Sequence, residues 1–200
     1  MTGVQTCALP ILPFPETNNN DFVYQPSRQE LEIEFAENFI NLEGKFSYCS
    51  SYQEFVDQLT QLLEAKKWTK IICKENKIIE QLQSSNFLKL DHETTVEFCD
   101  ASITSCECLV ARTGSILLSN ETESGRTQSV YAPIHICIAF ASQLVYDISD
   151  SLKLLNEKYK TNLPSVISLA TGPSRTADIE KTLVVGVHGP KEVFCFLIQD

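Results

Sequence analysis

Two glycine-containing loops carry the residues of this sequence that are best suited to chemistry. The first, residues 171–180, reads Thr-Gly-Pro-Ser-Arg-Thr-Ala-Asp-Ile-Glu and follows an apolar segment. Its Gly-Pro turn, capping hydroxyls and acidic residues predict that it opens a helix. A helix start offers N–H groups to an anion, and Arg175 adds a bidentate donor. A capped turn with an exposed arginine is the alternative. The predicted ligand-binding residues of this loop are Gly172, Ser174, Arg175, Thr176, Asp178 and Glu180.

The second loop, residues 186–190, reads Gly-Val-His-Gly-Pro. Flanking glycines allow close approach to a ligand and leave the imidazole of His188 available for acid–base catalysis. The alternative is a turn histidine bonded to a backbone carbonyl. Both loops follow predicted strands, and the 12 residues 171–182 suffice for a crossover between parallel neighbours. We therefore predict that the loops face one another, with Arg175 and His188 directed into one cavity.

Two weaker features could converge on this cavity. Arg126 lies in a polar Ser-Gly-Arg-Thr segment, and His135 begins an apolar strand. We predict both as ligand-binding residues, with a solvated cation and a satisfied core histidine as the respective alternatives. A hydrolase triad of Ser174, His188 and Asp178 lacks the GxSxG nucleophile elbow. The GxGxxG and Walker patterns of nucleotide sites are also missing.

The cysteines and histidines do not match a strong metal motif. Eight cysteines are present without any CxxC, and Cys73, Cys137 and Cys195 each lie within a short apolar run. The closest pair, Cys106 and Cys108, could hold a metal, as could the histidines with a carboxylate. Reduced core thiols in a cytoplasmic protein are the alternative that we favour. We therefore predict no metal and no cofactor bound by this chain.

Composition narrows the class of protein. The chain has 200 residues and a net charge of −10, so it lacks the basic footprint of a nucleic-acid-binding protein. No apolar run reaches the roughly 20 residues of a membrane span. Residues 1–11, MTGVQTCALPI, resemble translated sequencing-adapter read-through, so we expect the native start to be missing. We expect residues 1–25 to be this artefact plus an extended arm, and residues 26–200 to form a single domain.

The rest of the sequence must build the scaffold that positions these loops. Helical spacing of apolar residues predicts helices over residues 27–42, 51–67, 76–83 and 147–160. Apolar runs predict strands over residues 46–49, 70–73, 107–111, 115–118, 134–140, 165–170, 182–185 and 192–198. Residues 112–114, Arg-Thr-Gly, predict a hairpin-like turn, and residues 120–128 are polar. The alternation predicts an α/β fold, a three-layer sandwich with a mostly parallel or mixed sheet.

Three stretches resemble the LUD-domain family, and specifically its lactate-utilisation C branch. They read CECLVARTGSILLS, SGRTQSVYAPIHICIAF and TGPSRTADIEKTLVVGVHGPKEVFCFLI, and the likeness covers about residues 95–200. Many relatives carry an acidic residue before the Thr-Gly turn, where this chain has Arg112. That departure puts in doubt any role assigned to an acid there and makes Arg112 a candidate for its own ligand contact.

The resemblance implies a fold like that of CoA-transferases and ribose-phosphate isomerases. It also implies membership of a three-component system that oxidises L-lactate to pyruvate, in which two partner proteins carry iron–sulfur clusters. This chain has no cysteine cluster with iron–sulfur spacing, so we expect it to be the cluster-free component, with an anion-binding pocket. The alternatives are a transferase or isomerase acting on a CoA ester or phosphorylated metabolite, and an assembly module without chemistry.

Overall fold

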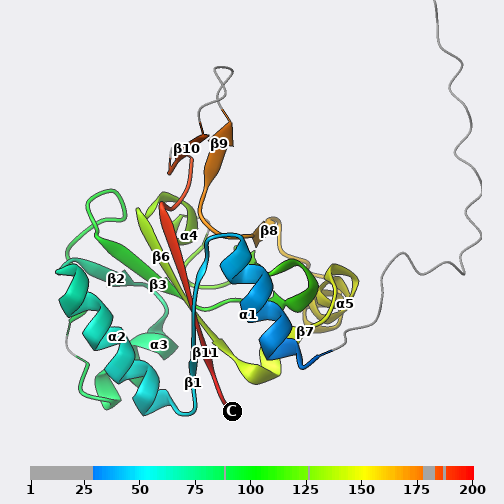
Figure 1. Cartoon of the computed structure of the whole chain (residues 1–200), viewed down its shortest axis with the longest axis horizontal. Coiled ribbons are helices and arrows are strands. Elements are labelled where there is room, and N and C mark those ends of the chain that lie inside the picture. Colours follow the sequence, from blue (N-terminus) through cyan, green and yellow to red (C-terminus); the bar gives the residue numbers. More distant parts are fainter. Residues whose placement is uncertain (1–28, 88, 126, 178–182, 187) are drawn as a thin grey trace, which may run out of the picture.

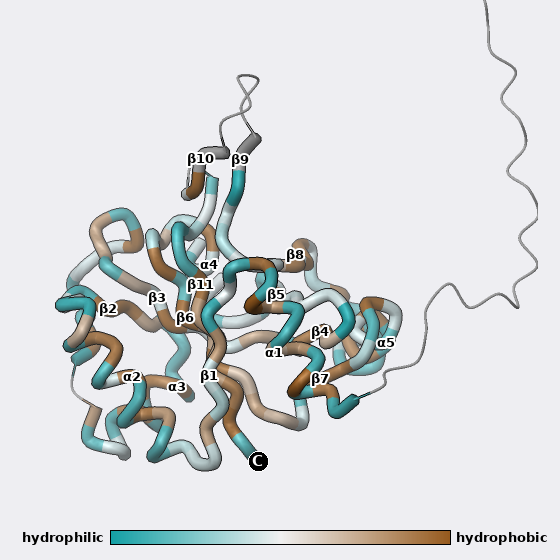
Figure 2. Tube along the Cα trace, in the orientation of Figure 1, coloured by the Kyte–Doolittle hydropathy of each residue, from teal (hydrophilic) through white to brown (hydrophobic). Residues whose placement is uncertain are grey.

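Five parallel strands form the centre of the molecule in the computed structural model, which describes residues 29–87, 89–125, 127–177, 183–186 and 188–200. Their spatial order is β1 (Lys45–Cys49), β11 (Glu192–Ile198), β6 (Ile134–Phe140), β3 (Ala101–Thr104) and β2 (Ile71–Cys73). Both faces of β6 are buried, which explains its almost continuous apolar sequence. Figure 2 shows these central strands as mainly hydrophobic segments.

Two helices cover one face of this sheet (Figure 1). They are α2 (Tyr52–Lys66) and α3 (Asn76–Ser84), and both predicted helices are confirmed. The side chain of Ser51 caps α2 by accepting a hydrogen bond from the N–H of Glu54. Phe55 and Leu59 of α2 pack with Ile136 and Phe196 of the sheet in one buried cluster.

The opposite face is covered by α1 (Leu31–Asn41) together with a second sheet. Phe35 and Phe39 of α1 stack on each other and pack against Cys137 and Cys195. The second sheet runs β7 (Leu144–Val145), β4 (Cys108–Val110), β5 (Ser115–Ser119) and β8 (Ile167–Ala170). Helix α5 (Ile148–Tyr159) packs against β4 on this side of the molecule.

The predicted α/β fold with a parallel or mixed sheet is confirmed, since the central sheet is parallel and the second is mixed. The predicted hairpin is also confirmed, because β4 and β5 pair antiparallel around the short helix Ala111–Thr113 and Gly114. Gly114 has φ +57°, and a Cβ there would lie 2.6 Å from the backbone nitrogen of Phe39. The turn therefore requires glycine.

The helix predicted to start within residues 171–180 is wrong for the part that the structure describes. Residues Arg175–Ala177 form strand β9, which pairs antiparallel with β10 (Leu183–Val185). The predicted crossover between parallel strands is therefore also wrong. The partner run Leu183–Val185 contains two β-branched valines, which favour an extended pairing that overrides the capping signals. The hairpin rises from the body of the molecule (Figure 1).

Strands β3 and β7 and helix α4 (Gln128–Tyr131) are among the elements that were not predicted. Strand β3 lies in a stretch whose sequence, Ala-Ser-Ile-Thr, carries only a weak strand signal. The four-residue helix α4 begins at the last residue of the polar segment 120–128. None of the helices in the described ranges has the length and apolar character needed to span a bilayer.

Candidate functional site

The two glycine-containing loops lie side by side, as their sequence predicts. The N–H of Ser174 donates to the carbonyl of Pro190 (2.9 Å), and the N–H of Gly186 donates to the carbonyl of Ser174 (3.0 Å). A pocket of about 300 Å³ opens between these loops, β8 and α4. Its lining residues are Leu118, Ser129, Val130, Ser168, Leu169, Ala170, Thr171, Gly172, Pro173, Ser174, His188, Gly189 and Pro190.

Glycine is required at two positions of this pocket. Gly172 has φ +82°, and a Cβ there would lie 2.3 Å from the carbonyl oxygen of Leu42. A Cβ on Gly189 would lie 2.8 Å from the Cβ of Ser174. The first close contact holds the loop against the α1–β1 turn and the second holds the two loops together. The glycines therefore set the shape of the pocket.

The pocket lies at the edge of the parallel sheet where β6 and β11 begin. Residues 188–190 directly precede β11, and α4 directly precedes β6. The loops follow β8 and β10, but neither strand belongs to the parallel sheet. The candidate pocket therefore lies away from the usual ligand position in open α/β sheets, which is beyond the carboxyl ends of the strands.

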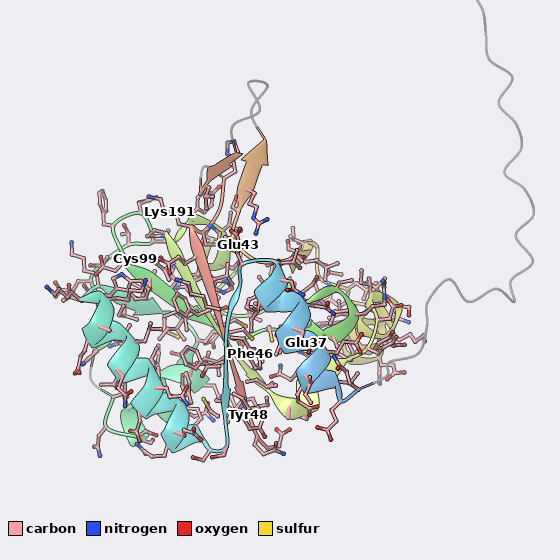
Figure 3. The ribbon with its side chains drawn as sticks, viewed as in Figure 1. Glu37, Glu43, Phe46, Tyr48, Cys99 and Lys191 are labelled. Carbon is pink, nitrogen blue, oxygen red and sulfur yellow. The ribbon has the colours of Figure 1, made fainter. Side chains whose placement is uncertain are left out.

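Arg175 differs from its predicted placement. Its guanidinium donates to the carbonyl of Leu42 (2.9 Å) and lies 3.1 Å from the carboxylate of Glu43. Glu43 lies in the turn between α1 and β1, near the base of β9 (Figure 3). Arg175 is not among the described residues that line the pocket. Pairing of β9 with β10 turns this side chain toward the α1–β1 turn instead.

His188 is exposed and lines the pocket, so it is available to a ligand. Gly172 and Ser174 line it with His188. Thr176 lies on β9, but its side chain is outside the described part. The predicted ligand-binding residues Arg126, Asp178 and Glu180 lie outside the described residues.

His135 is fully buried and does not line the pocket. Its Nε2 lies 2.8 Å from the hydroxyl of Thr104, whereas its Nδ1 has no hydrogen-bond partner in the described structure. Burial lowers the pKa of this imidazole to about 4, so the ring is neutral at neutral pH. The alternative of a core histidine with all its hydrogen bonds satisfied therefore holds for Nε2 and does not hold for Nδ1.

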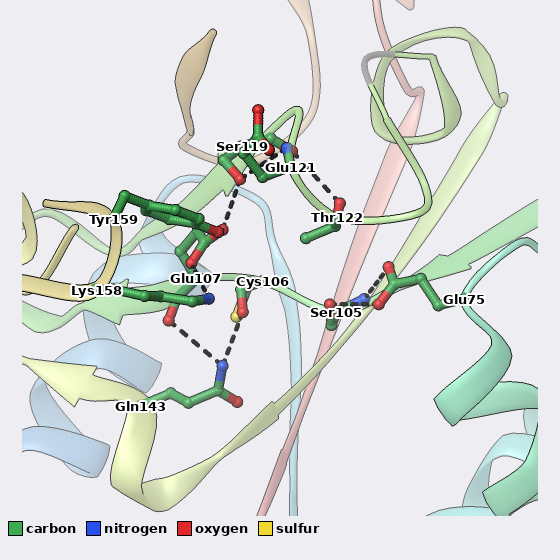
Figure 4. A network of polar contacts seen from close by, with 10 residues as sticks. All are labelled: Glu75, Ser105, Cys106, Glu107, Ser119, Glu121, Thr122, Gln143, Lys158 and Tyr159. Carbon is green, nitrogen blue, oxygen red and sulfur yellow. Dashed lines mark hydrogen bonds and ion pairs between the residues drawn. The ribbon is translucent and has the colours of Figure 1, made fainter. Parts of the chain in front are cut away.

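A buried carboxylate network joins the second sheet to α5 (Figure 4). Glu107 accepts hydrogen bonds from Ser119 Oγ (2.5 Å), Lys158 Nζ (2.7 Å) and Tyr159 Oη (2.7 Å). Burial raises the pKa of Glu107, but these three donors outweigh burial and leave the pKa below its usual value. One sequence signal could have indicated this network. Glu107 lies between Cys106 and Cys108 in an otherwise apolar run, where a charged side chain needs a partner.

A second buried carboxylate belongs to Glu75, which directly precedes α3. It accepts hydrogen bonds from the N–H of Ser105 (2.9 Å) and from the hydroxyls of Ser105 and Ser124. Figure 4 shows the contact between Glu75 and Ser105 beside the Glu107 network. Sequence reasoning missed Glu75, because its donors come from positions 30 and 49 residues away.

Arg112 binds within the protein. Its guanidinium donates a hydrogen bond to Asp147 (2.8 Å), the residue that caps α5. This hydrogen bond is the main reason that the pKa of Asp147 is lowered. The side-chain amide of Asn38 donates to the carbonyls of Ala111 and Arg112. Arg112 therefore anchors the hairpin turn to α5.

No group of three or more potential metal ligands occurs within the described ranges. The seven described cysteines are free and buried. Burial raises the pKa of Cys73 and Cys108 to about 12, so these thiols stay protonated at neutral pH.

A larger hollow, of about 740 Å³, lies between α1 and β1 (Figure 3 labels Glu37, Phe46 and Tyr48 there). The described residues that line it include three glutamates and no cation. An anion would be repelled there. The smaller pocket between the glycine-containing loops is therefore the better candidate site.

Comparison with known proteins gives consistent matches. The family described as "LUD domain" matches residues 33–198. Lactate utilization protein C of Anoxybacillus flavithermus is 30% identical over 159 residues, which are 74% of this chain and 71% of that protein. Lactate utilization protein C of Oceanobacillus iheyensis is 28% identical, over 92% of this chain and 76% of that protein.

Two further matches extend this picture. Protein NMB1437 of Neisseria meningitidis serogroup B is 35% identical, but the match spans only 50% of this chain and 42% of that protein. The crystal structure of a DUF162 family protein from Deinococcus radiodurans superposes with a TM-score of 0.64 and 19% identity. It covers 87% of this chain and 99% of that one, which supports the fold alone.

Proposed function

The chain belongs to the LUD domain family, and on this premise we propose that it is the cluster-free component of a system that oxidises L-lactate to pyruvate. The observation that carries this proposal is the similarity to proteins named lactate utilization protein C, one of them over 92% of the chain. The partners in this proposal are two iron–sulfur proteins, which would carry the electrons. This chain would contribute a binding site for a small carboxylate.

The geometry of the pocket between the glycine-containing loops supports such a site. Its backbone comes close to any occupant because Gly172 and Gly189 have no side chain, and His188 faces it from the second loop. A hydrogen bond from an imidazole N–H to a charged carboxylate is worth about 1.5–3 kcal/mol. That corresponds to roughly 10- to 150-fold in affinity.

Growth on L-lactate tests the proposed function. We expect a strain without this gene to fail on L-lactate as sole carbon source, to grow on pyruvate, and to recover when the gene is restored. Normal growth of the deletion strain on L-lactate would contradict the proposal. It would favour a stand-alone transferase or isomerase acting on a CoA ester or phosphorylated metabolite.

Variants in the same strain test the pocket. We expect His188→Asn to reduce growth on L-lactate without changing the melting temperature, because His188 is exposed and faces the pocket. His92→Asn is the matched control, since His92 is also exposed but lies near α3 on a different hollow. Equal growth of the two variants would remove His188 from the site.

Arg175→Ala distinguishes an anion donor from a structural contact. Because its guanidinium contacts Leu42 and Glu43, we expect growth to be kept and stability to fall by less than about 1 kcal/mol. Loss of growth with an unchanged melting temperature would restore Arg175 as a ligand-binding residue.

A further inference from the structure

A buried polar layer lies beneath α4, next to the pocket between the glycine-containing loops. Ser102 of β3 and His135 of β6 are directly paired neighbours, so their side chains point to the same face of the sheet. The hydroxyl of Ser102 donates to the carbonyl of Gln128, the first residue of α4 (2.8 Å). Helix α4 therefore covers His135, while its next two residues, Ser129 and Val130, line the pocket.

This layer contains hydrogen-bonding groups that the protein leaves unused. Gln128 and His135 are both fully buried. Within the described structure, the amide nitrogen and oxygen of Gln128 and the Nδ1 of His135 have no partner. A buried polar group without a partner costs about 1–3 kcal/mol. Two such side chains, Gln128 on α4 and His135 beneath it, therefore point to an occupant that satisfies them.

The hydrogen bonds around His135 define its tautomer. A threonine hydroxyl has one proton, and that of Thr104 is donated to the carbonyl of Ser105 (2.9 Å). The same hydroxyl therefore accepts its other hydrogen bond from the Nε2–H of His135. In the neutral ring, Nδ1 is then a bare acceptor. The group opposite it must be a donor.

The nearby charge limits what that donor can be. The carboxylate of Glu75 is buried and tied to Ser105, the residue that follows Thr104. The negative charge of Glu75 would repel a second carboxylate in this layer. The neutral ring of His135 needs a hydrogen-bond donor at Nδ1, and that donor does not have to be a cation. A neutral hydroxyl fits, because it can donate to His135 Nδ1 and accept from the amide nitrogen of Gln128.

We propose that His135 and Gln128 form a subsite for the hydroxyl group of a small hydroxycarboxylate whose carboxylate remains in the pocket between the glycine-containing loops. This rests on the proposed function and assigns the substrate contact to this chain. The ligand enters from the pocket when α4 lifts. Helix α4 has only four residues, and it exposes Val130 and Tyr131 to solvent, so its displacement uncovers little core.

Such a subsite distinguishes a hydroxy acid from the corresponding keto acid. L-Lactate supplies the proton that His135 Nδ1 requires, whereas pyruvate has only an acceptor at that position. A site built to bond a hydroxyl discriminates against analogues that lack it, because its buried groups are then left unpaired. We therefore expect the chain to bind L-lactate more tightly than pyruvate or propionate.

Nitrogen NMR of the histidine side chains tests the subsite directly. The chain has three histidines, so a histidine-labelled sample gives three assignable rings. We expect L-lactate to shift the Nδ1 resonance of His135 toward that of a hydrogen-bonded acceptor. We expect propionate and pyruvate to leave it in place. His92→Gln should behave as the unaltered chain.

A calorimetric comparison uses Gln128→Met, which keeps the volume and removes the amide. We expect its Kd for L-lactate to rise roughly 3- to 10-fold, the effect of one neutral hydrogen bond, with no change for propionate. A Nδ1 resonance that already shows a bonded acceptor without ligand, and that L-lactate does not move, would indicate an internal water only and overturn the proposal. So would an unchanged Kd in Gln128→Met.

The growth experiment tests the proposed function and the NMR experiment tests the subsite, so the two proposals can be rejected independently. If restoring the gene restores growth but His135 does not respond to L-lactate, the system is correct and the subsite is wrong. If the deletion strain grows normally on L-lactate, the proposed function is wrong whatever the resonance shows.

Discussion

Single residues here owe their chemistry to burial more than to their type. His135 lies at the start of an apolar strand and His188 follows an apolar run in the sequence, yet His135 is fully buried and His188 is exposed. Burial keeps the ring of His135 neutral and commits one nitrogen to Thr104. Exposure leaves His188 free to meet a ligand in the pocket.

The buried imidazole predicts sensitivity of the fold to acid. The pKa of His135 is about 4 in the folded protein, against about 6.5 for an unperturbed imidazole, so the unfolded chain binds more protons between these values. Stability therefore falls as pH drops from 6.5 toward 4, by about 3 kcal/mol in total from this group. We expect urea unfolding between about pH 7 and about pH 4.5 to show this loss in the native chain.

His135→Gln should lack that component of the pH dependence. Carboxylates protonate in both proteins, so the difference between the two free energies of unfolding isolates His135. A difference that stays constant from neutral to acid pH would contradict the burial of a neutral ring.

At the scale of elements, α5 is held by charged contacts at both ends. Asp147 at its start binds Arg112, and Lys158 and Tyr159 at its end bind Glu107. The side chain of Glu107 is fully buried, whereas that of Lys158 is 53% exposed. The two partners of this ion pair therefore lose different amounts of hydration.

Removing Lys158 should destabilise the protein by about 1–3 kcal/mol at neutral pH, because it leaves the Glu107 carboxylate buried with one donor fewer. Loss of the Lys158 hydrogen bond and charge leaves the pKa of Glu107 higher than it is in the native chain. The folded variant then takes up a proton more readily, so its deficit relative to the native chain should shrink as pH falls below the carboxylate range. Chemical unfolding of Lys158→Met at neutral and acid pH measures both effects.

Lys153→Met is the matched control on the same helix. Lys153 pairs with Asp150, and both side chains are largely exposed, at 71% and 42%. We expect a change of less than about 0.5 kcal/mol at either pH. Equal losses for Lys153→Met and Lys158→Met would mean that Glu107 does not hold α5 in place.

The close contact of Gly172 with the α1–β1 turn predicts a loss of stability when a side chain is added there. Gly172→Ala must move the backbone of Leu42 or its own loop, since the added Cβ would lie 2.3 Å from the Leu42 oxygen. Gly125→Ala also places alanine at positive φ, but nothing lies within 4 Å of its Cβ. We expect about 1–2 kcal/mol of destabilisation for Gly125→Ala from the left-handed backbone alone and a larger loss for Gly172→Ala.

Thermal unfolding of the two variants compares them directly. If Gly172→Ala loses no more stability than Gly125→Ala, the pocket loop does not depend on its close contact with the α1–β1 turn.

At the scale of the whole molecule, cysteines are distributed through the core instead of gathered into a site. The seven described cysteines all lie buried, and Cys106, Cys137 and Cys195 belong to one apolar cluster between α1 and the two sheets. Burial raises the pKa of Cys49 and Cys99 to about 11 and suppresses their thiolate forms.

We therefore expect the purified chain to be colourless and free of iron, and its buried thiols to be unreactive. In a Cys7→Ser variant only the seven described thiols remain, so a thiol reagent should react slowly in buffer and completely in denaturant. Iron near one equivalent after desalting, with visible absorbance, would contradict the prediction. Cys106 and Cys108 would then be the first ligands to replace.

The sequence by itself determined the four longer helices α1, α2, α3 and α5 and most of the strands, because amphipathic spacing and apolar runs report directly on which faces become buried. It also predicted that residues 172–174 and 188–190 come together, and they do. The parallel crossover from which this was predicted is absent from the described residues, because β9 and β10 pair antiparallel. The resemblance carried by the same loops identified the family.

Only the tertiary structure decided which way the polar side chains point. Local capping signals predicted a helix after Gly172, but long-range pairing with Leu183–Val185 made a strand and turned Arg175 toward Leu42. The partners of Glu107 lie 12, 51 and 52 residues away. Hydrogen bonds over such separations leave no periodic trace in a sequence, because their energy depends on burial that the assembled sheets create.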